Sequence, residues 1–144
     1  AQSFDLVTMW DVLEHLEDPR GVLEQVSRWL KPGGVLALNT VDSGSRGARM
    51  AGPHWRHLAP PHHLQYFTRA SLLHLLQDFG FRVMAARGQG VMWAADRRQA
   101  QLKGLRAVVE AVATHWRIRP LADALHLRDE VDIVALREHA VPPV

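Results

Sequence analysis

The chain has 144 residues and a formal net charge of +2, and 47% of its residues are hydrophobic and 22% charged. This length suffices for one domain with a buried core, and the composition is typical of a globular protein rather than a disordered or fibrous one. The absence of cysteine excludes disulfides and cysteine-ligated zinc. The longest apolar runs, such as residues 33–38, are too short to span a bilayer, so we expect a cytoplasmic protein.

Basic residues are concentrated in the second half of the chain. Residues 82–119 contain eight arginines and lysines against two acids. Such a stretch can attract anionic small molecules, phosphates or lipid headgroups, but we favour a solvated helix face. No recognition motif accompanies the charge, so nucleic acid is not an expected partner. A helix over residues 97–119 on an anionic membrane surface is a weaker alternative to a cap over a substrate pocket.

Two apolar segments flank the first expected helix. Phe4–Trp10 is short, apolar and partly β-branched, which predicts a strand buried on both faces. Asp18-Pro19 starts a helix whose apolar stripe runs to Leu30, and Lys31–Gly34 ends that helix. Val35–Val41 predicts a second buried strand. Strand, helix and strand form a βαβ unit, so the two strands should be parallel.

A long connection follows the second strand. Residues 42–61 are rich in Gly, Ser, Arg, His and Pro, and connections of this length are usually functional lids or disordered. Thr68 can cap a further helix, which Gly80 closes. The rest of the chain predicts a strand over Phe81–Ala86, a long amphipathic helix over residues 95–116, a short helix over Leu121–Leu127 and a last strand over Val131–Leu136.

The resulting order, β-α-β-loop-α-β-α-α-β, indicates an α/β sheet. The first strand has no polar alternation, so it would expose a flat apolar edge if nothing paired with it, and natural proteins avoid such edges. The sequence also begins at Ala1 rather than at a methionine. We therefore expect upstream residues to pair with this strand.

Four segments in order resemble class I S-adenosylmethionine-dependent methyltransferases, and within them the ubiquinone-biosynthesis O-methyltransferases and related small-molecule enzymes. They are the D-V-L-E-H-L run of Asp11–Leu16, Asp18-Pro19 at the helix start, L-K-P-G-G at Leu30–Gly34, and the Pro60–Val83 segment with its H-L-x-x-F-T and G-F-x-V pieces. Any one of them is a weak signal, but four with matching gaps are fairly specific. The resemblance covers roughly the first 90 residues.

This resemblance implies a Rossmann-like sheet of seven strands in the order 3-2-1-4-5-7-6, with the last strand antiparallel. The four strands expected here would be the family's strands four to seven, so residues 1–144 would be the C-terminal part of one methyltransferase domain, ordered 4-5-7-6. Residues 92–127 would be a helical cap inserted between the last two strands. The N-terminal half with its glycine-rich cofactor loop is absent, and Gly88-Gln89-Gly90 is no substitute because it follows a late strand. We expect the isolated chain to be inactive.

Ligands of open α/β sheets bind at the carboxyl ends of strands, where strand order reverses. Met9, Trp10 and Asp11 end the first strand, so we expect them to border S-adenosylmethionine, although Trp10 could also be a core residue. Transfer to a phenol-like acceptor gains from a general base. His15 is the first candidate base, because the ordinary pKa of histidine lies near neutrality, and His62 or His63 is the next.

The same segment has a competing role as a metal site. The resemblance implies that Asp11, Glu14 and His15 could hold a divalent cation, although the related enzymes have Glu at the position of Asp11. A role for Glu14 and His15 in shaping the turn before Asp18 is an equal alternative. The histidines of the long connection form no familiar zinc pattern, so we favour an aromatic lid or an unstructured loop for them; they are His54, His57, His62 and His63.

The leading functional hypothesis is methyl transfer from S-adenosylmethionine to a small-molecule acceptor, at oxygen in preference to nitrogen or carbon. The alternative is a non-catalytic module that forms interactions, including a homodimer, through its exposed edge strand or through the apolar stripe of Leu102–Trp116.

Overall fold

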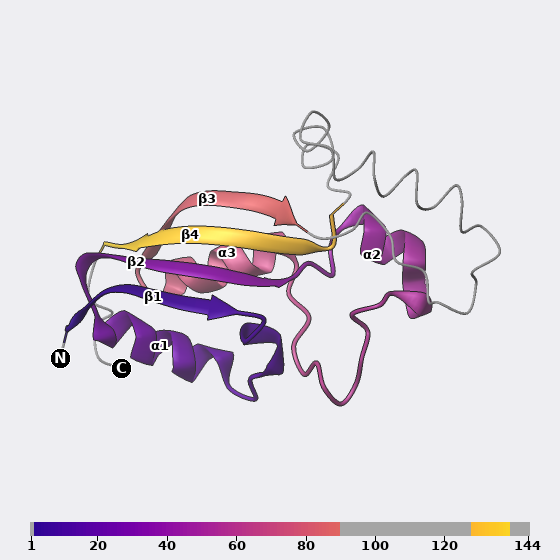
Figure 1. Ribbon diagram of the computed structural model, residues 1–144, viewed down its shortest axis with the longest axis horizontal. Coiled ribbons are helices and arrows are strands. Elements are labelled where there is room, and N and C mark those ends of the chain that lie inside the picture. The colour runs from indigo at the N-terminus through magenta and orange to yellow at the C-terminus, as the bar shows by residue number, and fades with distance from the viewer. Residues whose placement is uncertain (1, 90–127, 139–144) are drawn as a thin grey trace.

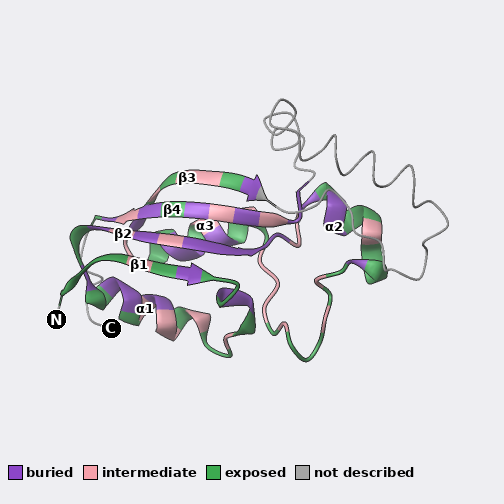
Figure 2. Ribbon diagram, viewed as in Figure 1, coloured by how far each residue is buried: buried purple, intermediate pink, exposed green. Residues whose placement is uncertain are grey.

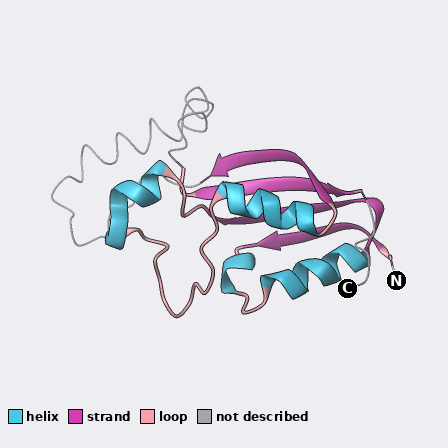
Figure 3. Ribbon diagram, turned by 180° about the vertical axis from the view of Figure 1, so that it is seen from behind, coloured by secondary structure: helices cyan, strands magenta, loops and turns pink. Residues whose placement is uncertain are grey.

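The computed structural model describes residues 2–89 and 128–138, which form a four-stranded sheet with two helices packed on one of its faces (Figure 1). Figure 3 shows both helices from behind, lying along the strands. The elements in chain order are β1 (Phe4–Trp10), α1 (Pro19–Trp29), β2 (Leu30–Val41), α2 (Arg46–Ala51), α3 (Arg69–Asp78), β3 (Phe81–Gln89) and β4 (Glu130–Arg137).

The strands are ordered β1-β2-β4-β3. β1 and β2 are parallel, and β4 is antiparallel to both of its neighbours. This arrangement confirms the predicted α/β class, the predicted order of the four strands and the antiparallel last strand. The carboxyl ends of β1 and β2 therefore meet at the same edge of the sheet, where Trp10 lies opposite Asn39.

The first helix begins where the sequence predicts. The Asp18 carboxylate accepts a hydrogen bond of 2.9 Å from the Gly21 backbone N–H, and Pro19 occupies the first turn. The helix ends earlier than expected, because Leu30 already has extended backbone and begins β2. Leu30 is fully buried at this junction, so its side chain belongs to the core although it is not helical.

The connection after β2 was expected to be a loop, and this prediction is wrong for its first part. The Ser45 hydroxyl accepts a hydrogen bond from the Ala48 N–H and caps α2, and a 3-10 turn follows at Gly52–His54. The glycine and arginine content hid this helix in the sequence. Its stability comes from tertiary packing, because Ala48 and Trp55 form a small second core with Val41.

The second expected helix is confirmed as α3. The Thr68 side chain accepts from the Ser71 N–H, the Ser71 hydroxyl in turn bonds the Thr68 N–H, and Gly80 follows the helix with a φ of 76°. β3 and β4 follow the predicted third and last strands and extend a little beyond them. The main core lies between the sheet and the helices and includes Leu23, Leu36, Leu38, Leu72, Leu76 and Ile133.

β1 was expected to be buried on both faces, and this prediction is wrong. Only Met9 is buried, whereas Phe4, Leu6 and Trp10 are 53%, 55% and 57% exposed. Side chains alternate along a strand, so Val7 and Met9 pack toward the helices and the other set points to the opposite face. Among the described residues nothing covers that face, and Figure 2 shows β1 largely exposed at the edge of the sheet.

The expected helical cap at 92–127, with its two helices, the residue Gly90 and the tail from Ala140 lie outside the described residues. None of the helices that the structure describes is long and apolar enough to cross a membrane.

Leu38 offers a direct test of the main core. Its side chain is fully buried, so Leu38→Ala should leave a cavity and lower the free energy of unfolding by about 2–5 kcal/mol in a urea titration of the 144-residue chain. Leu58, which is 46% exposed, is the matched control, and Leu58→Ala should change this free energy by less than about 0.5 kcal/mol. Equal losses in the two variants would contradict the packing described above.

Candidate active site

β1 ends in an unusual backbone conformation. Asp11 follows Trp10 directly and has a φ of 50°, in the left-handed region that residues other than glycine rarely adopt. Backbone strain of this kind concentrates at ligand-binding and catalytic positions. Of the three residues expected to border the cofactor, Met9 is in the core, while Trp10 and Asp11 are exposed at the end of the strand. The alternative of a core role for Trp10 finds no support in the described residues.

Glu14 forms hydrogen bonds to two other segments of the chain. It lies in a 3-10 turn, Leu13–His15, and its side chain is buried. One carboxylate oxygen accepts a 2.8 Å hydrogen bond from the Thr40 hydroxyl near the end of β2. Its backbone carbonyl accepts from the N–H groups of Leu64 and Gln65 at 2.8 and 3.0 Å. The turn after β1 is therefore fixed both to β2 and to the segment that precedes α3.

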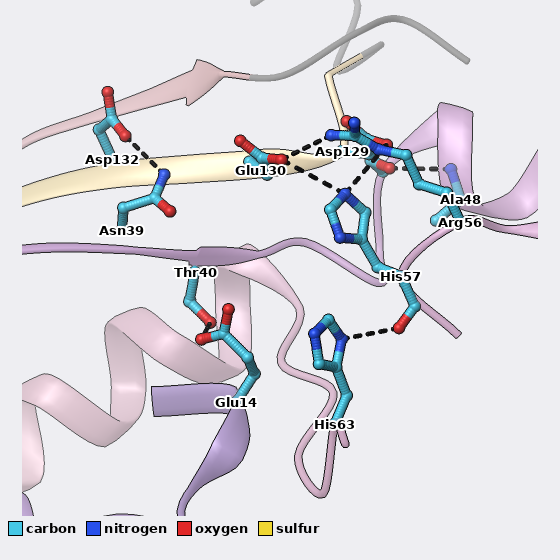
Figure 4. Close-up of polar contacts among 11 residues, drawn as sticks. Glu14, Asn39, Thr40, Ala48, Arg56, His57, His63, Asp129, Glu130 and Asp132 are labelled. Carbon is cyan, nitrogen blue, oxygen red and sulfur yellow. Dashed lines mark hydrogen bonds and ion pairs between the residues drawn. The ribbon is translucent and has the colours of Figure 1, made fainter. Parts of the chain in front are cut away.

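Two histidines near Glu14 are held in the same tautomer. Nδ1 of His15 lies 2.6 Å from the His62 carbonyl oxygen, and Nδ1 of His63 lies 2.7 Å from the His57 carbonyl oxygen. A carbonyl oxygen can only accept, so both Nδ1 atoms donate, and in each neutral ring Nε2 is the free acceptor. Figure 4 shows the second ring nitrogen of His63 on the side that faces Glu14.

The structure brings Glu14, His15 and His63 together. Each offers one ligand atom, these atoms lie within 4.8 Å of one another, and the rings of His15 and His63 meet edge to face with centroids 4.8 Å apart. Two imidazoles and a carboxylate suit a divalent cation, and the carbonyl bonds at both Nδ1 atoms are the contacts that metal-binding histidines usually make. Asp11, the third member of the predicted set, is not in this group, and His63 takes its place.

A second cluster fastens the segment after α2 to the start of β4 (Figure 4). Nε of Arg56 donates to Asp129 at 3.2 Å and its Nη2 to Glu130 at 2.6 Å. Nε2 of His57 lies 3.5 Å from the Asp129 carboxylate and 3.3 Å from that of Glu130, which are ion-pair distances rather than hydrogen bonds. We call these four residues the loop clasp.

The charges of the loop clasp shift two pKa values. Burial is the largest single influence on His57 and opposes its charged form, but the contacts with Asp129 and Glu130 outweigh it and raise the pKa of His57 above its ordinary 6.5. Burial likewise opposes the charged form of Asp129, but the contacts with His57 and Arg56 lower the pKa of this carboxyl below its ordinary 3.8.

Stability should depend on pH through these two groups. The contribution of His57 is complete below about pH 6.5 and is lost as the pH rises through its raised pKa, whereas that of Asp129 is present above about pH 4 and is lost as the pH falls through its lowered pKa. We therefore expect urea titrations to give a lower free energy of unfolding at pH 8 than at pH 6. His57→Gln should reduce this difference, and His74→Gln, an exposed site on α3, should not. A difference unaltered by His57→Gln would contradict the assignment.

The four histidines of the long connection, His54, His57, His62 and His63, do not form one cluster. The rings of His57 and His63 stack at 6.0 Å, and Trp55 and Tyr66 lie beside them. His62 contributes its carbonyl, and His54 belongs to neither of the two groups found among the described residues. The sequence did not predict the contacts that join Arg56 to Asp129 and Glu130. The density of histidine in residues 54–63 was the one signal that pointed to this region.

Comparison with known proteins agrees with this fold. A family model described as a methyltransferase domain matches residues 1–86. The ubiquinone biosynthesis O-methyltransferase of Xanthomonas axonopodis pv. citri is 31% identical over 108 residues, which are 71% of this chain and 44% of that protein. The enzyme of the same name from Haemophilus ducreyi is 45% identical over 42 residues, which are 29% of this chain and 18% of that protein. The chain thus matches less than half the length of these relatives.

Solved structures share the fold. A SAM-dependent methyltransferase from Thermotoga maritima, described as a possible histamine N-methyltransferase, superposes with a TM-score of 0.60 at 19% identity, over 95% of this chain and 57% of that one. A putative methyltransferase from Bacillus halodurans gives 0.56 at 14% identity, over 96% and 66%. Together the sheet order and these neighbours define a Rossmann-like methyltransferase fold. The matched family model makes the assignment more specific: the chain belongs to the class I S-adenosylmethionine-dependent methyltransferases.

Proposed function

We propose that this chain is part of an enzyme that transfers the methyl group of S-adenosylmethionine to an oxygen of a small molecule. The observation that carries the proposal is the arrangement at the end of β1. There the strained Asp11 backbone and the exposed Trp10 ring are followed, within five residues of Trp10, by the Glu14–His15 pair that His63 joins from the loop. One wall of a cofactor site is thus continuous with a group of acid–base side chains.

We assign the cofactor and the acceptor molecule to two different sets of residues in this chain. The cofactor supplies an electrophilic methyl group, and the protein has to hold the acceptor oxygen in line with it. We assign the backbone of Met9, Trp10 and Asp11 to the cofactor side, where the exposed Trp10 ring can cover a planar adenine or the sulfonium. The glycine-rich loop of the family is not in this sequence, so the isolated chain should not carry out the transfer.

The acceptor side is assigned to His15, His63 and Glu14. Nε2 of His15 can take the proton from the acceptor hydroxyl, because Nδ1 of this ring is already committed to the His62 carbonyl. His63 is the second base, and His62 acts through its carbonyl rather than its ring. The same three side chains fit a divalent cation as a competing role, because an Nε2 atom bound to a cation cannot also take a proton; the cation would then polarise the acceptor oxygen.

A methyl-transfer assay tests this function. The chain would be linked to the preceding half of the Xanthomonas relative, and transfer from labelled S-adenosylmethionine to a simple catechol would be measured. We expect transfer by the linked protein and none by the chain alone. Transfer by the chain alone would contradict the division of roles proposed above.

A second candidate function rests on β1. Its apolar side chains Phe4, Leu6 and Trp10 are more than half exposed, and the strand lies at the edge of the sheet. Such an edge favours pairing with another strand, so the chain could act as a non-catalytic interaction module that forms a homodimer. This candidate requires a dimer in light scattering, and a monomer would remove it.

A further inference from the structure

The segment between α2 and α3 is attached to the rest of the molecule on both sides of His63. Near its end, Leu64 and Gln65 donate backbone hydrogen bonds to the Glu14 carbonyl. Near its start, the loop clasp joins Arg56 and His57 to Asp129 and Glu130. His63 lies between these attachments, so the position of its ring depends on both.

The ring of His63 takes its orientation from the first half of this segment. Nδ1 of His63 donates to the His57 carbonyl at 2.7 Å, and the two imidazole planes stack within 15° of parallel. The hydrogen bond selects the tautomer in which Nε2 accepts, and the stacking holds the plane of the ring. The ring so placed forms a group with Glu14 and His15.

The His57 carbonyl in turn is held by the loop clasp. The Asp129 side chain is only 2% exposed and that of His57 15%, so water and salt screen the contact between these charges weakly. Glu130 is the first residue of β4 and pairs with Val41 of β2 and Gln89 of β3. The loop is therefore fixed to a strand with neighbours on both sides, which is a rigid support.

We propose that Arg56 and Asp129 are positioning residues for His63. In this role they act through the His57 main chain and not on a reacting atom. By fixing the His57 main chain they hold the His63 ring with Nδ1 donating and Nε2 directed to the group of Glu14 and His15. This inference deepens the proposed function and rests on it for its catalytic meaning. The positioning itself is a property of the chain that can be measured without any reaction.

Nuclear magnetic resonance of the imidazole nitrogens in the 144-residue chain is the test. In the unaltered chain at pH 8, His15 and His63 should both carry the proton on Nδ1. Asp129→Asn should return His63 toward the Nε2-protonated form that free histidine prefers. His15, whose Nδ1 is bound to the His62 carbonyl, should keep its tautomer and serves as an internal reference.

Two further variants complete the experiment. Arg56→Gln removes the other half of the ion pair and should shift His63 in the same direction, so the test survives if Asp129→Asn fails to fold. Asp78→Asn removes the same charge from the exposed Arg20–Asp78 pair and should leave both histidines unchanged. A His63 ring that keeps Nδ1 protonated in Asp129→Asn and Arg56→Gln would overturn the positioning role, as would an Nε2-protonated His63 in the unaltered chain.

Zinc titration tests whether the position of His63 affects cation binding. Loss of a contact that orients a metal-binding histidine typically weakens metal binding by about 10–100-fold. Asp129 belongs with His57 and Glu130 to a second group that could hold a cation, so the variant used is Arg56→Gln, which removes no candidate ligand and should bind Zn²⁺ at least about 10-fold more weakly than the unaltered chain. If the unaltered chain binds no Zn²⁺, the cation role proposed above fails, while the tautomer measurement still decides whether Arg56 and Asp129 position His63.

Discussion

His15→Ala should lower kcat for methyl transfer by about 100- to 10,000-fold, which is the usual contribution of a general base. The measurement uses the linked protein described above, with a catechol acceptor. The physical reason is that Nε2 of His15 is the acceptor left free by the bond between Nδ1 and the His62 carbonyl. The substitution removes that acceptor and leaves the backbone of the 3-10 turn in place.

The control for this prediction is His54→Ala. His54 is exposed, ends the 3-10 turn after α2 and belongs to neither described cluster, so its removal should leave kcat within a few-fold of the parent. A His15→Ala protein that retains kcat to the same degree would show that the acceptor proton leaves by another route. His63→Ala would then be the next variant to measure.

Glu14→Gln should weaken Zn²⁺ binding by the chain at least about 100-fold. Losing a contact that only orients a ligand typically costs about 10–100-fold, and this substitution removes a ligand itself. Glutamine keeps the carbonyl oxygen that accepts from the Thr40 hydroxyl, so the fold should survive. Calorimetric titration with Zn²⁺ measures the loss. His63→Gln should have a comparable effect.

Asp11→Asn separates the site seen in the structure from the site implied by the family resemblance. The structure leaves Asp11 outside the group of Glu14, His15 and His63, so this variant should keep its Zn²⁺ affinity within a few-fold. If Asp11→Asn loses the cation and His63→Gln does not, the ligands are Asp11, Glu14 and His15, and the geometry described here is not that of the metal-bound protein.

Local signals were sufficient for most of the fold. Asp18-Pro19 and Thr68 are capping residues that act within one turn, so the starts of α1 and α3 could be predicted from neighbouring residues alone. The antiparallel direction of β4 could not be predicted in this way, because no local signal in Glu130–Arg137 specifies it, and only the family resemblance supplied it. α2 was missed because its cap is an ordinary serine in a glycine- and arginine-rich stretch.

Only the part of the site that is contiguous in the sequence, Glu14 and His15, could be predicted. Glu14 and His15 adjoin a strand end, so their position at the carboxyl edge of the sheet followed from strand topology. His63 lies 48 positions further along than His15, and no periodicity relates the two. Their contact depends on the backbone bonds of Leu64 and Gln65 to Glu14 and on the ion pairs of Arg56, which are tertiary interactions. The prediction that β1 is buried on both faces was wrong for a similar reason, because burial depends on which elements cover the second face of the sheet.

Titration calorimetry with S-adenosylmethionine gives the most direct test of the proposal that this chain supplies the acceptor side and one wall of the cofactor site of a class I methyltransferase. The 144-residue chain alone should show no binding in the micromolar range. The same chain linked to the preceding half of the Xanthomonas relative should bind, and Trp10→Ala should weaken that binding. Micromolar binding by the chain alone would contradict the proposal, because it would mean that the end of β1 holds the cofactor without the glycine-rich loop.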